Sequence, residues 1–290
     1  MLRAAYRAAE RLYPPLYKAR ILRKALRTPL GPDYPYEGEA KVVRHLVDPG
    51  TAFFDVGANE GFYGLLLEDA IRPGRVVCFE PLPWLAKQLR GRLPRATVVE
   101  AALSDRPGTM TLRVPEIQGK VVATRATLED GVTEAGQTGA LTLRVQVLTL
   151  DQYVERERVD AIGFLKIDVE GHEEATLRGA ARTLERLRPV LMVEMEQRHH
   201  PGPLAQLLSA VEARGYRGYF LDSVEAGMHP LSRFDVAVHQ AAELHTTRRY
   251  VPNFFFFPRE RAEALLERAE AGLRTERGAP GRGTEGASRG

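Results

Sequence analysis

The feature of this sequence that most constrains its fold is a regular alternation of short apolar runs and longer amphipathic segments. Strands are predicted by TAFFDVG, RVVCFEP and ATVVEAAL, and the helices between them by GFYGLLLEDAI and PLPWLAKQLRGRL. Strands that alternate with helices in this way are the signature of βαβ units. The first half of the chain therefore predicts an α/β fold with a parallel sheet.

The second half of the chain repeats the alternation. Strands are predicted by AIGFLKID, RPVLMVEME, YRGYFLD and NFFFFP, and helices by HEEATLRGAARTLERL and PLAQLLSAVEARG. Two halves of an open α/β sheet place a ligand crevice at the carboxyl ends of their strands. The polar motifs of the chain lie at such ends.

Three segments depart from the alternation and divide the chain. Residues 1–35 form a basic arm with amphipathic helical character, in which eight Lys or Arg stand against Glu10 over residues 1–30. The segment 106–149, inside a central domain over 36–260, is β-like around a polar stretch rich in Gly and Thr. We interpret it as a hairpin-like excursion that either covers a site or is a simple surface insertion. Residues 261–290 predict a surface helix and a disordered Gly-rich tail.

Composition limits the classes of protein to which the chain can belong. At 290 residues and 44% hydrophobic content, it can bury a sizeable core, and the single cysteine, Cys78, excludes an internal disulfide framework. The expected location is cytoplasmic, because the sequence has neither a bilayer-spanning apolar window nor a secretory leader pattern.

The basic arm has two interpretations. It either packs on its own domain, or it docks to anionic lipid headgroups at the inner face of the membrane or to a polyanionic substrate. No nucleic-acid partner is expected, because no basic stripe with interleaved aromatic residues continues into the body of the chain.

The first polar motif is DVGANEGF, between a predicted strand and a predicted helix. Its two glycines allow a tight turn and a close backbone approach, and the helix N-terminus offers free N–H donors to a polar ligand. The glycine offsets differ from a GxGxxG dinucleotide fingerprint, and a purely structural turn would explain the glycines but not the whole string. The predicted cofactor-binding residues of this motif are Asp55, Gly57, Ala58, Asn59, Gly61 and Phe62.

The second motif is FEP, which closes the next strand with Glu80 and Pro81. An acidic side chain at this point of the topology can accept hydrogen bonds from both hydroxyls of a ribose. Glu80 is therefore predicted to bind the ribose of an adenosine cofactor. The alternative is a solvated glutamate at a strand end.

Together these motifs and several later ones resemble the FkbM family of S-adenosylmethionine-dependent methyltransferases. The similarity covers roughly residues 36–258 and rests on these strings: DVGANEG, FEP, AALSD, VLTLD, LKIDVEGHE, the GA at 179–180, RPVLMVE and NFFFFP. The resemblance implies a Rossmann-like class I methyltransferase fold, with a seven-stranded, mostly parallel sheet, an antiparallel last strand and helices on both faces. It also implies that S-adenosyl-L-methionine lies over DVGANEG, with Glu80 on its ribose and Ser104 and Asp105 near its adenine.

The same resemblance implies a reaction. Members of the family are typically O-methyltransferases that act on hydroxyls of sugars, glycolipids or polyketide-type products, so the expected partner is a small-molecule or glycan acceptor. Two alternatives remain. One is a Rossmann-type NAD-dependent oxidoreductase, which Asn59 and LKIDVEGHE disfavour, and the other is a non-catalytic scaffold that resembles a methyltransferase.

The string LKIDVEGHEE carries the candidate catalytic residues, Lys166, Asp168, Glu170 and His172. Lys166 and Asp168 share a strand face, and Asp168 is expected to orient the amino group of the cofactor or the acceptor. His172 or Glu170 could accept the acceptor's proton, and the ordinary pKa of histidine lies nearest to neutrality. The structural alternative is that these acids stabilise the start of a helix and that His172 is an ordinary first-turn residue.

A metal site was also considered at the ends of two neighbouring strands. Asp168, Glu194 and Glu196 offer hard oxygen ligands that suit Mg²⁺. Their spacing is not a recognised metal signature, and the adjacent His199 and His200 add little. No metal ligands are therefore assigned.

Overall fold

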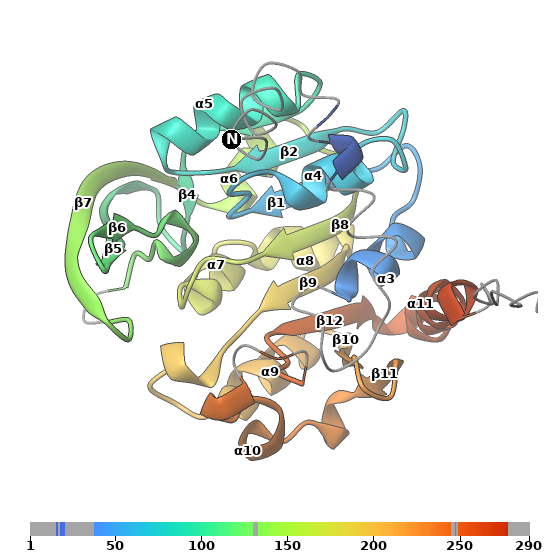
Figure 1. Cartoon of the computed structure of the whole chain (residues 1–290). Helices are drawn as coiled ribbons and strands as arrows, with labels where there is room; N and C mark the ends of the chain where they lie inside the picture. Colours follow the sequence, from blue (N-terminus) through green and yellow to red (C-terminus); the bar gives the residue numbers. More distant parts are fainter. Residues whose placement is uncertain are drawn as a thin grey trace, which may run out of the picture.

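The fold was analysed in a computed structural model, which describes residues 16, 18–20, 38–129, 133–244, 247 and 249–277 (Figure 1). Most of the basic arm and the Gly-rich tail lie outside these residues. Within the arm, residue 16 and residues 18–20 are helical, and Lys18 Nζ lies 2.7 Å from Glu68 Oε1 and 2.6 Å from Asp69 Oδ2. These contacts fit an arm that packs on its own domain. Among the described residues, no helix is both long and apolar enough to cross a bilayer.

The centre of the molecule is one large twisted sheet with the strand order β11-β10-β12-β9-β8-β1-β2-β3. Its strands are β1 Ala52–Val56, β2 Val76–Phe79, β3 Thr97–Val99, β8 Ile162–Ile167, β9 Val190–Glu194, β10 Tyr216–Asp222, β11 Gly227–Pro230 and β12 Asn253–Pro258. The run from β3 to β9 is parallel, and β12 is antiparallel to both of its neighbours. The predicted mostly parallel sheet with an antiparallel last strand is confirmed.

The predicted number of strands was too small by one. Strand β11 pairs with the edge strand β10 as an antiparallel hairpin, so the sheet has eight strands. The turn between them forms because Asp222 Oδ1 accepts hydrogen bonds from the N–H groups of Val224 (2.7 Å) and Glu225 (2.9 Å).

Helices cover both faces of this sheet, as predicted. They are α3 Glu39–Leu46, α4 Phe62–Leu67, α5 Pro83–Arg92, α6 Leu150–Arg156, α7 Glu173–Arg178, α8 Ala181–Leu187, α9 Leu204–Glu212, α10 Val236–His239 and α11 Ala262–Arg277. Apolar residues from α3, α4 and α11 pack on one side of the sheet, and apolar residues from α6, α8 and α9 pack on the other. Strand β1 contributes to the apolar clusters on both sides, since Phe53 faces the first cluster and Phe54 faces the second. The strands are therefore apolar throughout rather than alternating.

The segment HEEATLRGAARTLERL forms two helices, α7 and α8, where one was predicted. The helix is interrupted at Gly179, a position that only glycine fits, because a Cβ there would lie 2.0 Å from the carbonyl oxygen of Ser104. The new N-terminus of α8 is capped by Asp151, whose carboxylate accepts from the N–H groups of Arg182 (3.0 Å) and Thr183 (2.7 Å).

A second, four-stranded sheet stands beside the first, in the order β4-β7-β5-β6. Its strands are β4 Ala102–Leu103, β5 Gly108–Ile117, β6 Lys120–Val121 and β7 Gln137–Leu148. Strands β5 and β7 form a long antiparallel hairpin across the excursion over 106–149. The predicted strand ATVVEAAL is split, because β3 belongs to the large sheet and β4 pairs with β7. A third apolar cluster joins this small sheet to Leu82 and Leu85 at the start of α5.

Candidate functional site

A cleft of about 590 Å³, a volume that includes space open to solvent, lies at the carboxyl ends of β1, β2 and β8. Its lining residues are Val56, Gly57, Asn59, Phe79, Glu80, Pro81, Ala101, Ala102, Leu103, Leu112, Ala123, Thr124, Ala126, Leu128, Asp168, Val169 and Glu170. The strand ends supply one wall, and the excursion supplies the other through Leu112 and residues between 123 and 128. Of its two interpretations, the structure favours the one in which the excursion covers a site.

The turn after β1 brings the backbone of the first motif against the end of β8. Gly57 has a φ of +74°, and a Cβ on it would lie 1.8 Å from the carbonyl oxygen of Asp168. Only glycine fits this approach. Gly57 and Ala58 donate their N–H groups to the carbonyl oxygen of Phe79, and Asn59 is left with its N–H aimed at Glu80.

Glu80 lies in the cleft, with 4% of its surface exposed. Its Oε2 accepts from the N–H of Asn59 (2.8 Å) and its Oε1 from the N–H of Leu82 (2.9 Å). Burial raises the pKa of this carboxyl to about 7, although both N–H groups favour the ionised form. Each oxygen keeps a lone pair for a further donor, so the carboxylate can accept two ligand hydroxyls.

A buried ion-pair group lies beneath the cleft. Lys166 Nζ is 3.0 Å from Asp168 Oδ2 and 3.6 Å from Asp55 Oδ1, and Lys166 and Asp55 are 5% and 1% exposed. Desolvation opposes the charged ammonium, but the two carboxylates outweigh it, and the pKa of Lys166 is raised above its ordinary value. Asp168 therefore reaches the cleft with its orientation set by a buried lysine.

Further acids gather at the same edge of the sheet. Burial, reinforced by the negative charge of Asp168, raises the pKa of Glu170 to about 9 and that of Glu194 well above its ordinary value. At neutral pH Glu170 is therefore protonated and can donate a hydrogen bond. One oxygen from each of Asp168, Glu170 and Glu194 lies within 4.8 Å of the others, as do ligand atoms of Glu170, Glu196 and His199. Carboxyl groups of this kind can bind hydroxyl groups, and a cation in either group would first have to displace a proton.

His172 lies behind the wall of the cleft and does not line it. Its Nδ1 is 2.6 Å from Glu129 Oε1, its Nε2 is 2.8 Å from Ser104 Oγ, and the residue is 5% exposed. Both ring nitrogens are thus engaged within the protein. This histidine ties the excursion, through Glu129, to the start of α7.

The structure brings together only part of the residues that the sequence singled out. Those that line the cleft are Gly57, Asn59, Glu80, Pro81, Asp168 and Glu170. Asp55 and Lys166 lie below it, whereas Ala58 and Phe62 pack against the core behind the turn. Gly61 begins α4 with a φ of +83°.

Ser104 and Asp105, which were expected near the adenine, are not among the residues that line this cleft. The cleft is lined by Ala101, Ala102 and Leu103, whereas Ser104 faces His172 and Asp105 pairs with Arg178 (3.2 Å). The string AALSD therefore supplies its apolar half to the cleft.

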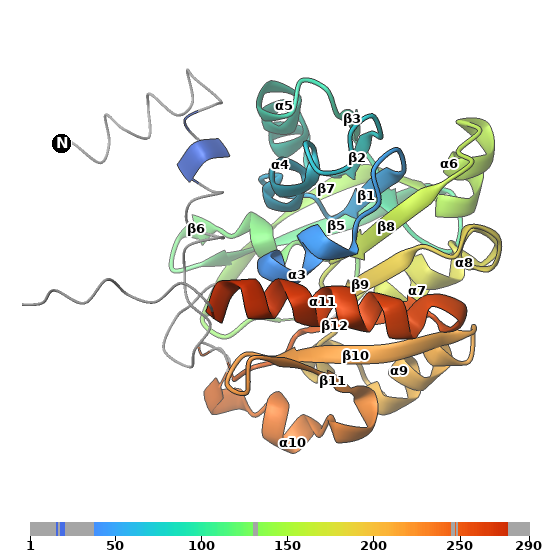
Figure 2. The same ribbon diagram turned by 90° about the vertical axis from the view of Figure 1, so that its right-hand side faces the viewer.

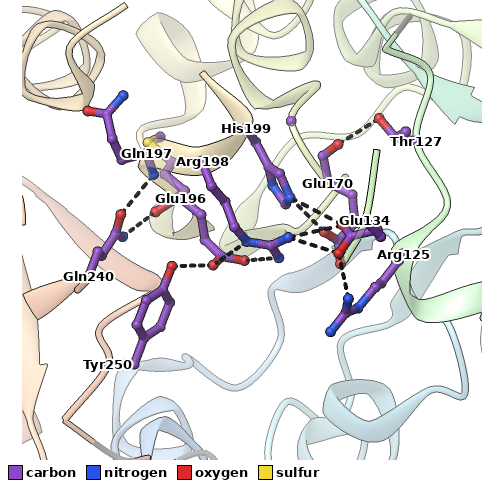
Figure 3. A network of polar contacts seen from close by, with 12 residues as sticks. Arg125, Thr127, Glu134, Glu170, Glu196, Gln197, Arg198, His199, Gln240 and Tyr250 are labelled. Atoms are coloured by element: carbon purple, nitrogen blue, oxygen red, sulfur yellow. Dashed lines mark hydrogen bonds and ion pairs between the residues drawn. The ribbon is translucent and has the colours of Figure 1, made fainter. Parts of the chain in front are cut away.

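A polar network beside the cleft carried no sequence motif (Figure 3). Arg198 donates through Nε and Nη2 to Glu196, at 2.9 and 2.8 Å, and through Nη1 to Glu134. Tyr250 also donates to Glu196, and Arg125 donates to Glu134. These residues come from the excursion, the segment after β9 and the segment before β12, so only the tertiary structure assembles them.

Known protein sequences and structures are similar to this chain. The Methyltransferase FkbM domain matches residues 55–217, which is more than half of the chain. Hexuronic acid methyltransferase AglP of Haloferax volcanii is 27% identical over 179 residues, or 59% of this chain and 68% of that protein.

Solved structures are similar at lower levels of identity. Methyltransferase FkbM from Methylobacillus flagellatus KT aligns with 18% identity and a TM-score of 0.44, over 85% of this chain and 51% of that one. This chain thus spans about half the length of that structure. Aeropyrum pernix fibrillarin in complex with natively bound S-adenosyl-L-methionine aligns with 13% identity and a TM-score of 0.38, over 75% of this chain and 72% of that one.

Proposed function

The chain belongs to the FkbM methyltransferase family, and on the premise that it is an S-adenosylmethionine-dependent methyltransferase we propose that it methylates a hydroxyl group of a sugar-containing acceptor. Its fold is the Rossmann-like class I methyltransferase fold. Family membership replaces the oxidoreductase alternative. The observation that carries the proposal is a single cleft with two kinds of acid. Glu80 is buried and suited to a ribose, and Asp168 and Glu170 form an acidic rim suited to hydroxyl groups.

The residues of the cleft fit the cofactor. Glu80 would hold the ribose hydroxyls, Gly57 and Asn59 would border the polar part of the molecule, and Leu103, Leu112 and Leu128 offer apolar surface to an adenine ring. S-adenosylmethionine, when bound, supplies a methyl group on a sulfonium.

We assign the acceptor chemistry to the end of β8. Asp168 accepts the proton of the attacking hydroxyl, because its carboxylate reaches the cleft and is fixed by Lys166. Lys166 is a positioning residue, since it is buried beneath Asp168. Glu170, protonated at neutral pH, donates a hydrogen bond to a second hydroxyl or ring oxygen of the acceptor. His172 has no part in proton transfer, because both of its nitrogens are engaged behind the cleft.

The relative AglP supports a sugar acceptor. Its name describes a methyltransferase that acts on a hexuronic acid, and it aligns with 59% of this chain. An acidic, hydrogen-bonding rim is also the surface that a polyhydroxyl ligand needs.

The test is methyl transfer from methyl-labelled S-adenosylmethionine to a panel of glycosides, with the product identified by mass spectrometry. We expect a single O-methyl ether on a sugar ring. Transfer only to nitrogen or carbon nucleophiles would contradict the proposal. The absence of cofactor binding in calorimetry would instead favour the non-catalytic scaffold.

A further inference from the structure

Basic side chains beside the cleft bind a carboxylate of the protein itself, that of Glu134. Glu134, on the excursion, accepts from Nη1 of Arg198 at 3.0 and 3.2 Å and from Nη1 of Arg125, and its side chain is 7% exposed (Figure 3). His199 Nε2 lies 3.8 Å from the same carboxylate. Two guanidinium groups and an imidazole thus converge on one carboxylate.

This group adjoins the acceptor end of the cleft. His199 Nε2 is also 3.7 Å from Oε2 of Glu170, which lines the cleft, and Thr127 fixes that region by donating to the carbonyl oxygen of Glu170 (2.6 Å). His199 therefore lies next to the cleft residue Glu170, and Arg125 and Arg198 join the group through Glu134.

The charges in this group are balanced as long as Glu134 is present. Glu196 is already neutralised by the two-pronged contact with Arg198, and it also accepts from Tyr250. Among the described residues, Glu134 is the one carboxylate with which Arg125 forms an ion pair. Without Glu134, Arg125 would have no ion-pair partner among the described residues, and one arm of Arg198 would be left without its carboxylate.

The imidazole adds an unused polar atom. The side chain of His199 is 5% exposed, and its buried Nε2 has no hydrogen-bond partner within the protein. Burial lowers the pKa of His199, so the ring is neutral near pH 7 and Nε2 can serve a ligand as donor or acceptor. Unpaired buried polar atoms are costly, and this one is available to a ligand.

We propose that Arg125, Arg198 and His199 form a receptor for the carboxylate of an acidic sugar, a uronic acid unit of the acceptor, and that Glu134 occupies this receptor until the acceptor binds. The proposal rests on the proposed sugar O-methyltransferase activity and narrows its substrate class. Arginine suits this task because its planar fork matches a carboxylate. The internal carboxylate would also disfavour neutral sugars, which cannot compete for two guanidinium groups.

The test compares two sugars that differ only at C6. Binding of methyl β-D-glucuronide and methyl β-D-glucoside to the full chain is measured by calorimetry in the presence of S-adenosylhomocysteine. We expect the glucuronide to bind at least about tenfold more tightly, the worth of one charge-assisted pair. Arg125→Gln should remove this difference, and Glu134→Gln should tighten glucuronide binding several-fold.

Several results would overturn the receptor. They are equal affinities for the two sugars, binding of neither, or a Glu134→Gln variant that binds the glucuronide more weakly while its thermal unfolding matches the parent. Methyl transfer to a neutral glycoside with equal affinities would leave the proposed function intact and remove only the receptor. If the parent chain did not bind S-adenosylhomocysteine, the result would instead contradict the proposed methyltransferase function.

Discussion

At the scale of single residues, position decides which acids of the cleft carry charge. Glu80 and Glu170 are buried enough to hold a proton near or above neutrality, with pKa values of about 7 and about 9. Asp168, by contrast, has an ammonium 3.0 Å away. Three carboxyl groups in one cleft are thereby suited to three tasks: binding a ribose, donating to an acceptor and accepting a proton.

The first prediction concerns Glu80 and pH. Because its pKa in the folded chain is about 7, the carboxyl gains a proton as the pH falls from about 8 to about 6, and one acceptor for the ribose is lost. S-adenosylmethionine affinity should fall over this window. Glu80→Gln should bind weakly throughout, without this dependence, when both are followed by calorimetry.

The same shift has a consequence for folding that serves as an internal check. A pKa raised from 4.5 means that the neutral form contributes stability below pH 4.5, and that this contribution is lost as the pH rises through about 7. Without cofactor, the stability of the parent should therefore fall relative to that of Glu80→Gln as the pH rises from about 4.5 to about 7. If the affinity of parent and variant depended on pH in the same way, Glu80 would not be the residue that binds the ribose. The matched control is Glu100→Gln, at an exposed position.

The second prediction separates Asp168 from Glu170. Asp168→Asn should lower kcat about a hundredfold or more, because the asparagine amide cannot accept the proton. Glu170→Gln should stay within about tenfold of the parent at pH 7, because glutamine resembles the protonated acid. Steady-state methyl transfer measures both. Comparable losses in the two variants would contradict the assignment of the base, and thermal unfolding would confirm that each variant is folded.

At the scale of elements, the β5–β7 hairpin and the chain between its strands add a second wall to the cleft at the sheet edge. Leu112 of β5 and the residues around the short 3₁₀ helix Ala123–Arg125 form the wall opposite the strand ends. His172 and Glu129 attach that wall to α7. The excursion thus supplies cleft lining and, through Arg125 and Glu134, the proposed acceptor contacts.

The third prediction follows from this wall. S-adenosylmethionine should slow amide hydrogen exchange in residues 123–128, by up to about a hundredfold when its concentration is a hundred times Kd. Exchange in the β10–β11 turn, residues 223–226, should not change, because this turn does not line the cleft. Equal protection of both regions would indicate global stabilisation instead of contact with the wall.

At the scale of the whole molecule, the helix near the end of the chain packs on the helix that precedes the first strand. Figure 2 shows α11 lying along α3, where Leu265, Ala269 and Leu273 are buried in the core cluster on that face. Arg268 fastens the pair, because it donates to the carbonyl oxygens of His45 (2.7 Å) and Val47 (2.9 Å) and to Asp48 Oδ1 (2.9 Å). The two ends of the domain therefore stabilise each other.

The fourth prediction tests this connection. Arg268→Ala should lower the free energy of unfolding by about 1 kcal/mol, because the carbonyl groups of His45 and Val47 lose their donor. Urea unfolding at neutral pH measures the change. Arg274→Ala, on the exposed side of the same helix, should change stability by less than about 0.5 kcal/mol. Equal effects of the two substitutions would show that the contacts of Arg268 contribute little.

Predictions from sequence succeeded where local pattern decides the outcome. Hydrophobic periodicity predicted the strands and helices, and the topology of an open α/β sheet then placed Glu80 and Asp168 at neighbouring strand ends. Prediction failed at Gly179, where one predicted helix is two in the structure. Gly179 lies against the backbone of Ser104, some 75 residues earlier, and no local pattern records that contact.

What the sequence determined by itself is the α/β architecture and the strand ends at which polar residues gather, because both follow from local periodicity and from the rules of parallel sheets. The tertiary structure alone decided which side chains face the cleft. It turned Ala101 to Leu103 inward and Ser104 away, and it engaged His172 while leaving Nε2 of His199 unpaired. It also brought Arg125, Glu134 and Arg198 together. Neighbouring residues point to opposite sides, so contacts between distant segments depend on register and packing that no local pattern records.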